Sequence, residues 1–217
     1  MSAPTHWWWV RHAPVPGAPV RLFGQLDVSC ETTDLNSFRA LAAILPEDAV
    51  WIVSSLARTR ETMEAIAAAG TLLPEPVVEP DFSEQNFGLW QGLSWTEMEA
   101  DDPETYGTFW RNPVRTAPPH GESYADHVAR ARAAIERLTA CYAGRTLVCV
   151  SHGGTIRAAI ATALSLDAEA ALAVVVDNLS VTRLSYVEDK LLRGAGAVWL
   201  VQGVTCPCRW IVPGRPC

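Results

Sequence analysis

Short apolar runs recur along the chain, and several of them stop abruptly at polar residues. The first covers residues 7–10 and stops at Arg11 and His12. A run this short and this apolar is typical of a strand buried on both faces of a parallel sheet. The pattern therefore predicts one central sheet, with further extended segments at 49–53, 77–82, 146–150, 180–187 and 197–201.

Between these runs, apolar residues recur at helical spacing. The spacing predicts four helices, over 34–45, 58–69, 124–142 and 155–164. Asp34 is expected to cap the first of them, and Gly70 is expected to close the second. Strands that alternate with helices predict an α/β fold, a three-layer α/β/α sandwich around a mostly parallel central sheet.

Residues 93–123 interrupt this alternation. The stretch holds large side chains among prolines and acidic residues, namely Trp95, Met98, Tyr106, Phe109 and Trp110. It predicts short helices inserted as a small helical cap, outside the sheet. No linker or repeat divides the rest of the chain, so we expect a single domain over 1–217, with an irregular tail rich in Cys and Pro over about 203–217.

Composition limits the partners. The chain has 217 residues and a formal net charge of −7 at pH 7. A negative balance argues against nucleic acid, which requires a basic face. No stretch approaches the roughly 20 apolar residues that cross a bilayer, and residues 1–6 lack the basic region of a signal peptide. We therefore expect a cytoplasmic protein with no membrane partner.

The cysteines do not suggest a disulfide framework. A domain of this size does not need disulfides, and the Cys-Pro-Cys sequence near the end lacks the paired spacing of a zinc site. Reduced thiols are expected, while a redox or metal role for the tail stays an alternative. Three cysteines are scattered and three cluster near the end: Cys30, Cys141 and Cys149, then Cys206, Cys208 and Cys217.

Charged and titratable side chains gather where three predicted strands end. Arg11 and His12 follow the first strand, Arg58 lies shortly after the second, and His152 follows the run 146–150. Parallel strands present their carboxyl ends at one edge of the sheet, where α/β proteins bind ligands. Two imidazoles also fit a metal site, but the adjacent arginine opposes a cation, whereas guanidinium groups match phosphate oxygens. The same cations favour a neutral, nucleophilic His12.

Glycine-containing stretches let the backbone approach a ligand at this edge. Gly153 lies at the start of a predicted helix, whose N-terminal amides favour an anion. Gly24 precedes Gln25, which is a better candidate for a ligand contact than the nearby Asp27. We therefore predict that Gln25 and Gly153 bind the substrate.

Four segments together carry a family resemblance. They are Arg-His-Ala at 11–13, Ser-Ser-Leu-Ala-Arg-Thr-Arg-Glu-Thr at 54–62, Glu-Gln-Asn-Phe-Gly-Leu-Trp-Gln-Gly at 84–92 and Ser-His-Gly at 151–153. In this order, over roughly residues 7–190, they resemble the histidine phosphatase superfamily. More narrowly, they resemble its phosphoglycerate-mutase-like branch, which includes cobalamin-pathway phosphatases of the alpha-ribazole type.

The resemblance implies a role for each residue of the cluster. His12 would attack phosphorus and carry a transient phosphohistidine, while Arg11, Arg58 and His152 would hold the phosphoryl oxygens. Glu84 would protonate the leaving alcohol and later deprotonate the attacking water. The arginines would supply the positive charge, so the resemblance implies neither a metal nor a cofactor.

The sequence departs from the family pattern after the first motif. Ala13 stands where the family has glycine, and a proline-rich loop replaces the usual threonine and asparagine. Gln25 is the candidate to replace the missing asparagine contact to phosphate. Glu122 also matches a family motif, and we expect it to support the pocket, with Glu84 as the acid.

We therefore expect a cofactor-independent hydrolase of a small phosphomonoester. The alternatives are a phosphoglycerate-type mutase, a non-catalytic module that binds a phosphate ligand on the same fold and, least favoured, a zinc hydrolase. The substrate is not fixed by the sequence, although the aromatic residues from Trp90 to Trp110 favour a flat or bulky leaving group, such as a nucleoside-like riboside. A homodimer is compatible with the sequence but is not required by it.

Overall fold

A six-stranded sheet forms the centre of the protein in the computed structural model, which describes residues 3–17, 20–70, 75–188 and 198–207. The strand order is β3-β2-β4-β1-β5-β6. The first four strands in this order run parallel to one another, whereas β5 pairs antiparallel with both β1 and β6. The strands are β1 (Thr5–Arg11), β2 (Val50–Val53), β3 (Val77–Val78), β4 (Thr146–Ser151), β5 (Ser180–Val187) and β6 (Val198–Pro207).

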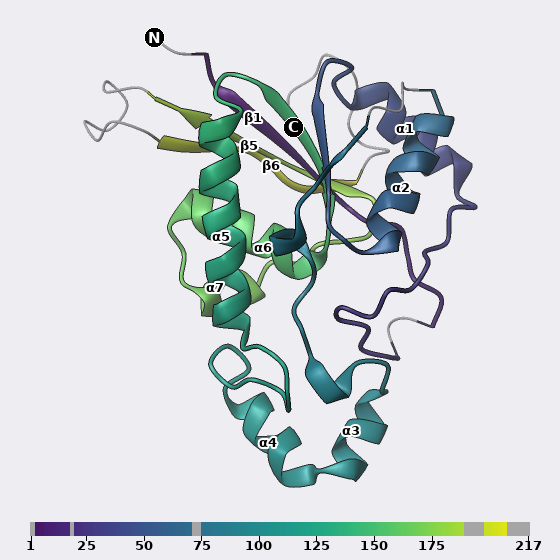
Figure 1. Cartoon of the computed structure of the whole chain (residues 1–217), viewed down its shortest axis with the longest axis vertical. Helices are drawn as coiled ribbons and strands as arrows, with labels where there is room; N and C mark the ends of the chain where they lie inside the picture. Colours follow the sequence, from purple (N-terminus) through teal and green to yellow (C-terminus); the bar gives the residue numbers. More distant parts are fainter. Residues whose placement is uncertain (1–2, 18–19, 71–74, 189–197, 208–217) are drawn as a thin grey trace.

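Helices cover both faces of this sheet (Figure 1). On one face, α1 (Leu35–Ile44) and α2 (Ala57–Ala68) pack a core that includes Phe38 and Met63. On the other face, α5 (Tyr124–Cys141) and α6 (Gly153–Leu164) pack a second core, and the short α7 (Ala168–Leu172) lies against α6. The predicted three-layer α/β/α sandwich is therefore confirmed.

Strand β1 lies at the centre because its side chains fill both cores. Trp7 and Trp9 are fully buried on the α5–α6 side, where their rings stack with centroids 4.9 Å apart, and Phe82 meets both rings edge-on. Trp8 points to the opposite face, partly buried, with the Arg183 guanidinium 4.5 Å from its ring centroid. Burial on both sides fixes the position of the strand end that carries Arg11.

Local capping sets where the helices begin. Asp34 accepts a hydrogen bond from the Ser37 amide, as predicted. Ser123 and Asp126 form a reciprocal capping box at the start of α5. Helix α2 has no cap of its own, and Asp27, 30 residues earlier in the chain, accepts the Ala57 amide at 2.6 Å instead.

Two predicted segments are wrong in their extent. The extended segment expected over 77–82 is a strand only at Val77–Val78, because Pro80 lacks an amide donor and begins a 3₁₀ helix, Pro80–Phe82. Residues 203–207 of the predicted irregular tail continue β6, since Val181 and Ser180 of β5 pair with Cys206 and Pro207. Residues 208–217 lie outside the described residues.

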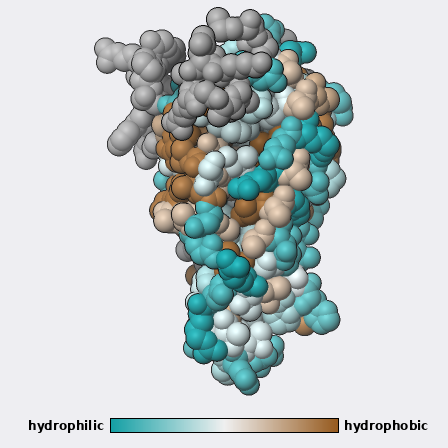
Figure 2. All heavy atoms as spheres, turned by 90° about the vertical axis from the view of Figure 1, so that its left-hand side faces the viewer, coloured by the Kyte–Doolittle hydropathy of each residue, from teal (hydrophilic) through white to brown (hydrophobic). Residues whose placement is uncertain are grey.

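The stretch between 88 and 123 forms a helical cap. It contains a 3₁₀ helix, Gly88–Trp90, followed by α3 (Trp95–Asp101) and α4 (Pro103–Arg111). Figure 1 places α3 and α4 at the end of the molecule opposite the N-terminus. The face in Figure 2 is mostly polar or neutral at this lower end, with apolar side chains gathered higher up, and the cap residues Met98 and Phe109 are buried.

None of the helices in the described part of the chain combines the length and the apolar character that crossing a membrane requires. Of the cysteines, Cys30, Cys141 and Cys149 form no disulfide. Cys206 lies in β6, whereas Cys208 and Cys217 fall outside the described residues.

Candidate active site

The ends of β1 and β4 place two histidines side by side. Arg11 is in register with Ser151, so the next residues, His12 and His152, leave the sheet at the same level. The His12 amide donates to the Ser151 carbonyl at 2.9 Å, and the two imidazole centroids are 5.1 Å apart. The predicted convergence of the two strand ends is thus present in the structure.

Arg58 is a buried cation that donates three hydrogen bonds to neutral acceptors. Its side chain, in the first turn of α2, is 2% exposed. Its guanidinium donates to the carbonyls of Gly24 and Leu26 at 2.6 and 2.8 Å and to His152 Nδ1 at 3.3 Å. Among the described residues, no carboxylate forms an ion pair with it. Its charge therefore remains available to an anion.

His12 has the tautomer and charge of a nucleophile. Its Nδ1 lies 2.7 Å from the Ala13 carbonyl, which can only accept, so Nδ1 carries the proton and Nε2 keeps its lone pair. Burial, followed by the positive charges of Arg58 and Arg11, lowers the pKa of His12 to about 3. The imidazole is therefore neutral at physiological pH, as the sequence predicted.

The backbone around His12 is anchored on both sides. Asn178, in the loop before β5, donates its side-chain amide to the His12 carbonyl at 2.7 Å. Thr62 of α2 accepts the Ala13 amide at 2.9 Å. Neither residue was predicted, because these contacts join segments far apart in the chain and leave no local sequence pattern.

Arg11 and His152 occupy different positions relative to the cavity. Arg11 lines it, donates one Nη to the Val176 carbonyl and keeps a buried Nε without a partner. His152 is fully buried behind the cavity, with Nε2 2.8 Å from Ser54 Oγ and Nδ1 facing Arg58. Burial and then Arg58 lower the pKa of His152 well below its ordinary value. Direct contact between His152 and a phosphoryl oxygen stays a prediction.

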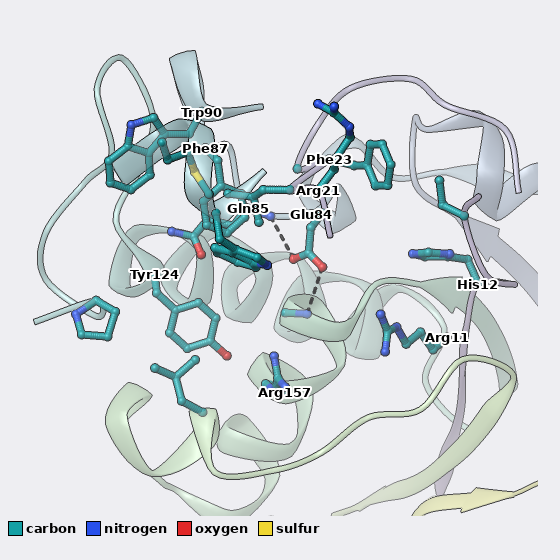
Figure 3. Close-up of a pocket in the computed structure, with 18 of the residues that line it drawn as sticks. Arg11, His12, Arg21, Phe23, Glu84, Gln85, Phe87, Trp90, Tyr124 and Arg157 are labelled. Atoms are coloured by element: carbon teal, nitrogen blue, oxygen red, sulfur yellow. Dashed lines mark hydrogen bonds between the residues drawn. The ribbon is translucent and has the colours of Figure 1, made fainter. Parts of the chain in front are cut away.

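Glu84 lines the middle of the cavity, between the end that holds His12 and Arg11 and the aromatic residues of the cap (Figure 3). Its carboxylate accepts the Gln85 amide at 3.0 Å and the Gly154 amide, at the N-terminus of α6, at 3.2 Å. Burial raises the pKa of Glu84, but His127, the two amides and Arg58 outweigh that effect, and the net shift is downward. Glu84 is therefore ionised before a ligand binds.

The sequence analysis predicted a ligand contact at Gly153 and did not predict one at its neighbour, Gly154. A Cβ at Gly154 would collide with Glu84 Oε1, so only glycine leaves room for the carboxylate at this amide. A Cβ at Gly153 would lie 3.7 Å from Arg11 Nε, an ordinary contact. Gly153 does not line the cavity, whereas Gly154 does. The double glycine in the sequence was the available signal, but it did not identify which residue matters.

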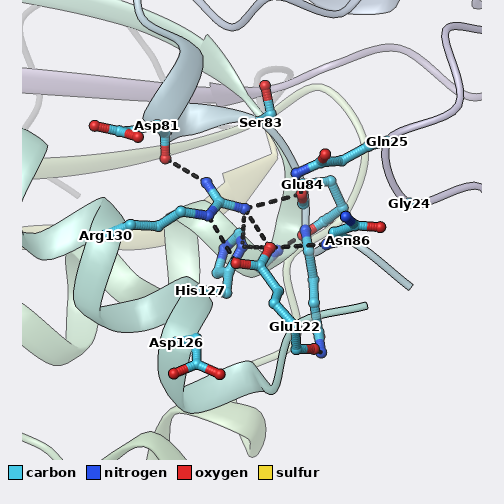
Figure 4. Close-up of polar contacts among 12 residues, drawn as sticks. Gly24, Gln25, Asp81, Ser83, Glu84, Asn86, Glu122, Asp126, His127 and Arg130 are labelled. Atoms are coloured by element: carbon cyan, nitrogen blue, oxygen red, sulfur yellow. Dashed lines mark hydrogen bonds and ion pairs between the residues drawn. The ribbon is translucent and has the colours of Figure 1, made fainter. Parts of the chain in front are cut away.

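A buried network holds the Glu84 segment from behind (Figure 4). Arg130 of α5 donates to both carboxylate oxygens of Glu122, at 3.0 and 2.7 Å, and to the Glu84 carbonyl at 3.0 Å. Glu122 also accepts the Asn86 amide at 2.8 Å. Burial opposes ionisation, but His127, Arg130 and the amide lower the pKa of Glu122 to about 2. Glu122 thus supports the pocket without entering it.

Gln25 is directed to the protein and away from the cavity. Its side-chain amide donates to the Glu84 carbonyl at 2.9 Å, and its backbone amide donates to Gln91 Oε1 at 2.6 Å. Gln25 is absent from the lining of the cavity, although Gly24 contributes to it. The expected substitution for a phosphate-binding asparagine is therefore not what the structure favours, because Gln25 joins Arg130 in holding the Glu84 backbone.

The cavity in front of these residues has a volume of about 630 Å³, large enough for a metabolite-sized ligand. His12 and Arg11 lie at one end of it, and aromatic side chains form much of the rest (Figure 3). Arg58 also lines the cavity. Of the aromatic residues singled out in the sequence, Tyr106 does not line the cavity. The lining aromatic residues are Phe23, Phe87, Trp90, Trp95, Phe109, Trp110 and Tyr124.

Within the described residues, no group of three or more His, Cys, Asp or Glu side chains is arranged to hold a metal ion. The polar groups that converge at the strand ends are donors and cations, which suit an anion.

The model of the histidine phosphatase superfamily (branch 1) matches residues 7–193 of the chain. The chain belongs to this superfamily. The match covers every strand-end residue of the cluster, and it confirms the family that the four sequence motifs indicated.

Two curated relatives of this histidine phosphatase share about a third of their aligned residues with it. A Mycobacterium tuberculosis protein named a bifunctional protein is 32% identical over 150 residues, which are 69% of this chain but only 39% of that protein. An Arabidopsis thaliana protein named a metal-independent phosphoserine phosphatase is 32% identical over 155 residues, 69% of this chain and 64% of the relative. The chain thus spans about two fifths of the first of these relatives.

Solved structures agree with the family and the fold. The native structure of mycobacterial glucosyl-3-phosphoglycerate phosphatase has a TM-score of 0.76 and 26% identity, covering 94% of this chain and 99% of that one. The alpha-ribazole phosphatase from Shigella flexneri has a TM-score of 0.76 at 20% identity, covering 93% and 96%, and shows a shared fold.

The close packing of Gly154 generates a first prediction. Gly154→Ala should force the Glu84 carboxylate away from the α6 N-terminus and, if Glu84 acts as an acid on a phosphomonoester, should lower kcat for alkyl phosphates by about 10–100-fold. Steady-state kinetics on an alkyl and an activated aryl phosphate measure this change. Gly107→Ala is the matched control, because nothing lies within 4 Å of a Cβ at Gly107 in α4. Unchanged kinetics in Gly154→Ala would contradict this description of the site.

The ionised Glu122 predicts a pH-dependent contribution to stability. Because its pKa is lower in the folded protein than the ordinary 4.5, the contribution is fully present above about pH 4.5 and is lost as pH falls toward 2. Glu122→Gln should therefore reduce the free energy of unfolding by about 1–2 kcal/mol at pH 6, allowing for solvent screening, with a smaller difference near pH 2.5. Urea unfolding at both pH values measures it, and Glu99→Gln, on the exposed side of α3, is the control. An equal loss at both pH values would show that charge is not involved.

Proposed function

We propose that this histidine phosphatase is a metal-independent hydrolase of a small phosphomonoester that works through a phosphohistidine intermediate. The observation that carries the proposal is the neutral His12, which keeps a free Nε2 and is close to the buried charge of Arg58 and the half-buried charge of Arg11. Such a site attracts a phosphoryl group and presents a lone pair to it. The names of the relatives, which include a metal-independent phosphatase, support the same activity.

In the first step, the Nε2 lone pair of His12 forms a bond to phosphorus as the bond from phosphorus to the leaving oxygen breaks. Arg11 and Arg58 stabilise the charge on the phosphoryl oxygens. Glu84 donates its proton to the leaving alcohol. The Nδ1 proton of His12 stays with the Ala13 carbonyl, which holds the ring in one orientation while the ring becomes positively charged.

In the second step, water attacks the phosphohistidine. Glu84, now a carboxylate, accepts a proton from the water, and the new oxygen–phosphorus bond replaces the bond between His12 and phosphorus. Inorganic phosphate leaves and His12 is again neutral. Glu84 then releases to solvent the proton that it took up from solvent when the substrate bound, and the ligand-free protonation states are restored. The step consumes one water and needs no metal or cofactor.

The protonation of Glu84 must follow substrate binding. Without a ligand, amide donors and nearby positive charge keep the pKa of its carboxyl low. A phosphate dianion placed between Glu84 and the arginines neutralises that positive charge and adds a negative one, and both effects raise the pKa of Glu84. The substrate itself thus prepares the acid that its leaving group requires.

The proposal also decides between the alternative functions and assigns a location and partners. A mutase would return the phosphoryl group from His12 to its product, whereas a hydrolase passes it to water; we favour hydrolysis because the more similar named relatives are phosphatases. A purely binding module would not require a free Nε2 opposite a poised carboxylate. We also propose a cytoplasmic location, no nucleic-acid partner and a small-molecule substrate.

Removal of the nucleophile tests the proposal. His12→Ala should lower kcat/KM for 4-nitrophenyl phosphate by about 10⁴-fold or more, because the variant lacks the imidazole nitrogen that forms the bond to phosphorus. Quench of the wild-type protein with SDS at alkaline pH, during turnover of a ³²P-labelled substrate, should trap a phosphohistidine that is stable to base, lost in acid and absent from the variant. Wild-type protein that turns over no phosphomonoester would favour the binding module, and transfer of label to a second product alcohol would favour the mutase.

The acid role of Glu84 predicts a dependence on the leaving group. Glu84→Gln should slow an alkyl phosphate by about 10²–10⁴-fold, since a poor leaving group requires the proton, and 4-nitrophenyl phosphate by less than about 10-fold. Pre-steady-state rates for the two substrates measure the difference. If both substrates slow by the same factor, Glu84 is not the acid.

The proposal also predicts that metal chelation has no effect. The positive charge comes from arginines, so dialysis against EDTA should leave kcat and KM unchanged. Activity before and after dialysis, with and without added Zn²⁺, Mg²⁺ or Mn²⁺, measures this. Loss of activity that zinc restores would establish the zinc hydrolase alternative instead.

A further inference from the structure

The cavity extends past Glu84, away from His12, to two further polar side chains, those of Tyr124 and Arg157 (Figure 3). Tyr124, the first residue of α5, is 3% exposed, yet its hydroxyl has no hydrogen-bond partner. Its ring stacks on His127 at 5.9 Å and packs in a cluster with residues of α5 and α6, so its position is fixed. A buried hydroxyl rarely lacks a partner, and one that faces a cavity suggests an absent ligand atom.

Arg157 of α6 forms the other half of this pair. Its Nε donates to the Val174 carbonyl at 2.7 Å, which orients the guanidinium toward the cavity that it lines. None of the described residues gives it a carboxylate partner. Figure 3 shows the Tyr124 hydroxyl directed toward Arg157. The pair thus presents a cation and a neutral donor to the same space.

The cavity is lined by more positive charge than a phosphate group requires. Within the part of the chain that the structure describes, four arginines but only one carboxylate, Glu84, line it. Arg11 and Arg58 flank His12, and Arg21 forms an ion pair with Glu97 at 3.1 Å. Arg157 remains as a partly buried positive charge without an anion, beyond the leaving-group side of Glu84. A partly buried positive charge is costly unless it is paired, and here the substrate can supply the negative partner.

We propose that Tyr124 and Arg157 form a subsite for a carboxylate on the leaving group, so that the preferred substrates are phosphomonoesters of hydroxy acids. The assignment rests on the proposed function, because Glu84 marks where the leaving oxygen lies. One guanidinium and one neutral hydroxyl match a planar anion with a single negative charge. Phosphate, in contrast, receives two arginines elsewhere in the same cavity. Burial raises the pKa of Tyr124, so the hydroxyl acts as a donor.

A matched set of aryl phosphates tests the subsite. The substrates are 3-carboxyphenyl phosphate, its neutral analogue 3-carbamoylphenyl phosphate and unsubstituted phenyl phosphate. In the wild-type protein, kcat/KM should be about 10–100-fold higher for the carboxylate than for the carbamoyl compound. The 2- and 4-carboxy isomers report the distance between the subsite and the leaving oxygen. Equal kcat/KM for each carboxylate and its carbamoyl analogue would overturn the proposal.

Variants assign the preference to this pair. Arg157→Gln should reduce the ratio to about 1, and Tyr124→Phe should reduce it by about 2–10-fold, while hydrolysis of phenyl phosphate stays within a few fold of wild type. Retained phenyl phosphate activity shows that each variant folds. Tyr106→Phe is the matched control, because Tyr106 lies in the cap without lining the cavity. A preference that survives in Arg157→Gln would overturn the assignment.

A binding measurement separates the subsite from the hydrolysis. Calorimetric titration of His12→Ala protein with 3-carboxyphenyl and 3-carbamoylphenyl phosphate needs no turnover. Tighter binding of the carboxylate, abolished by the additional Arg157→Gln change, supports the subsite even if no wild-type phosphatase activity is found. Equal binding of the two compounds overturns the subsite even if phosphatase activity is confirmed.

Discussion

The site depends on guanidinium charge that is buried at the carboxyl end of the sheet without a carboxylate in contact. Arg58 is 2% exposed, and its donors go to two carbonyls and an imidazole nitrogen, all uncharged. Burial of a charge is costly, and these neutral acceptors compensate for lost hydration without cancelling the charge. Burial, together with this positive charge, lowers the pKa of His12, and the charge attracts an anion to the same place. One constraint thus keeps His12 neutral and prepares the binding site.

Glu84 is positioned in a different way from the residues at the strand ends. Glu84 lies on an irregular segment, and its position is fixed from two directions. In front, the amide of Gly154 holds the carboxylate, and from behind, Arg130 and Gln25 hold its backbone carbonyl. Glu122 keeps Arg130 in place through two charge-assisted hydrogen bonds. The acid role proposed for Glu84 requires such support, because the segment has no regular secondary structure and a small displacement would separate the carboxylate from the leaving oxygen.

The residues that end strands could be predicted from the sequence, because the signal is local. An apolar run that stops at Arg11 and His12, with a similar run before His152, is enough to place these side chains at one edge. The three-layer fold followed from the same alternation. Residues whose roles depend on distant contacts could not be predicted. Asn178 holds the His12 carbonyl across 166 positions of the chain, and no periodicity records that contact.

The predictions that were wrong also failed because contacts between distant parts of the chain decide the outcome. Gln25 has the right chemistry for a phosphate, but the Glu84 carbonyl occupies its amide. The tail appeared irregular from its Pro and Cys content, yet pairing with β5 extends β6 to Pro207, since cross-strand hydrogen bonds override local composition. Tyr124 looked like the first residue of a helix, and only its unpartnered hydroxyl in the folded protein marks it as part of the cavity.

The most direct measurement is a crystal structure of the protein with orthovanadate, which adopts the trigonal bipyramidal geometry of phosphoryl transfer. Vanadium bonded to His12 Nε2, with equatorial oxygens on Arg11 and Arg58 and an apical oxygen facing Glu84, is the predicted result. Vanadate bound elsewhere, or a cation between His12 and His152, would contradict the central claim that buried guanidinium charge prepares this site for phosphate.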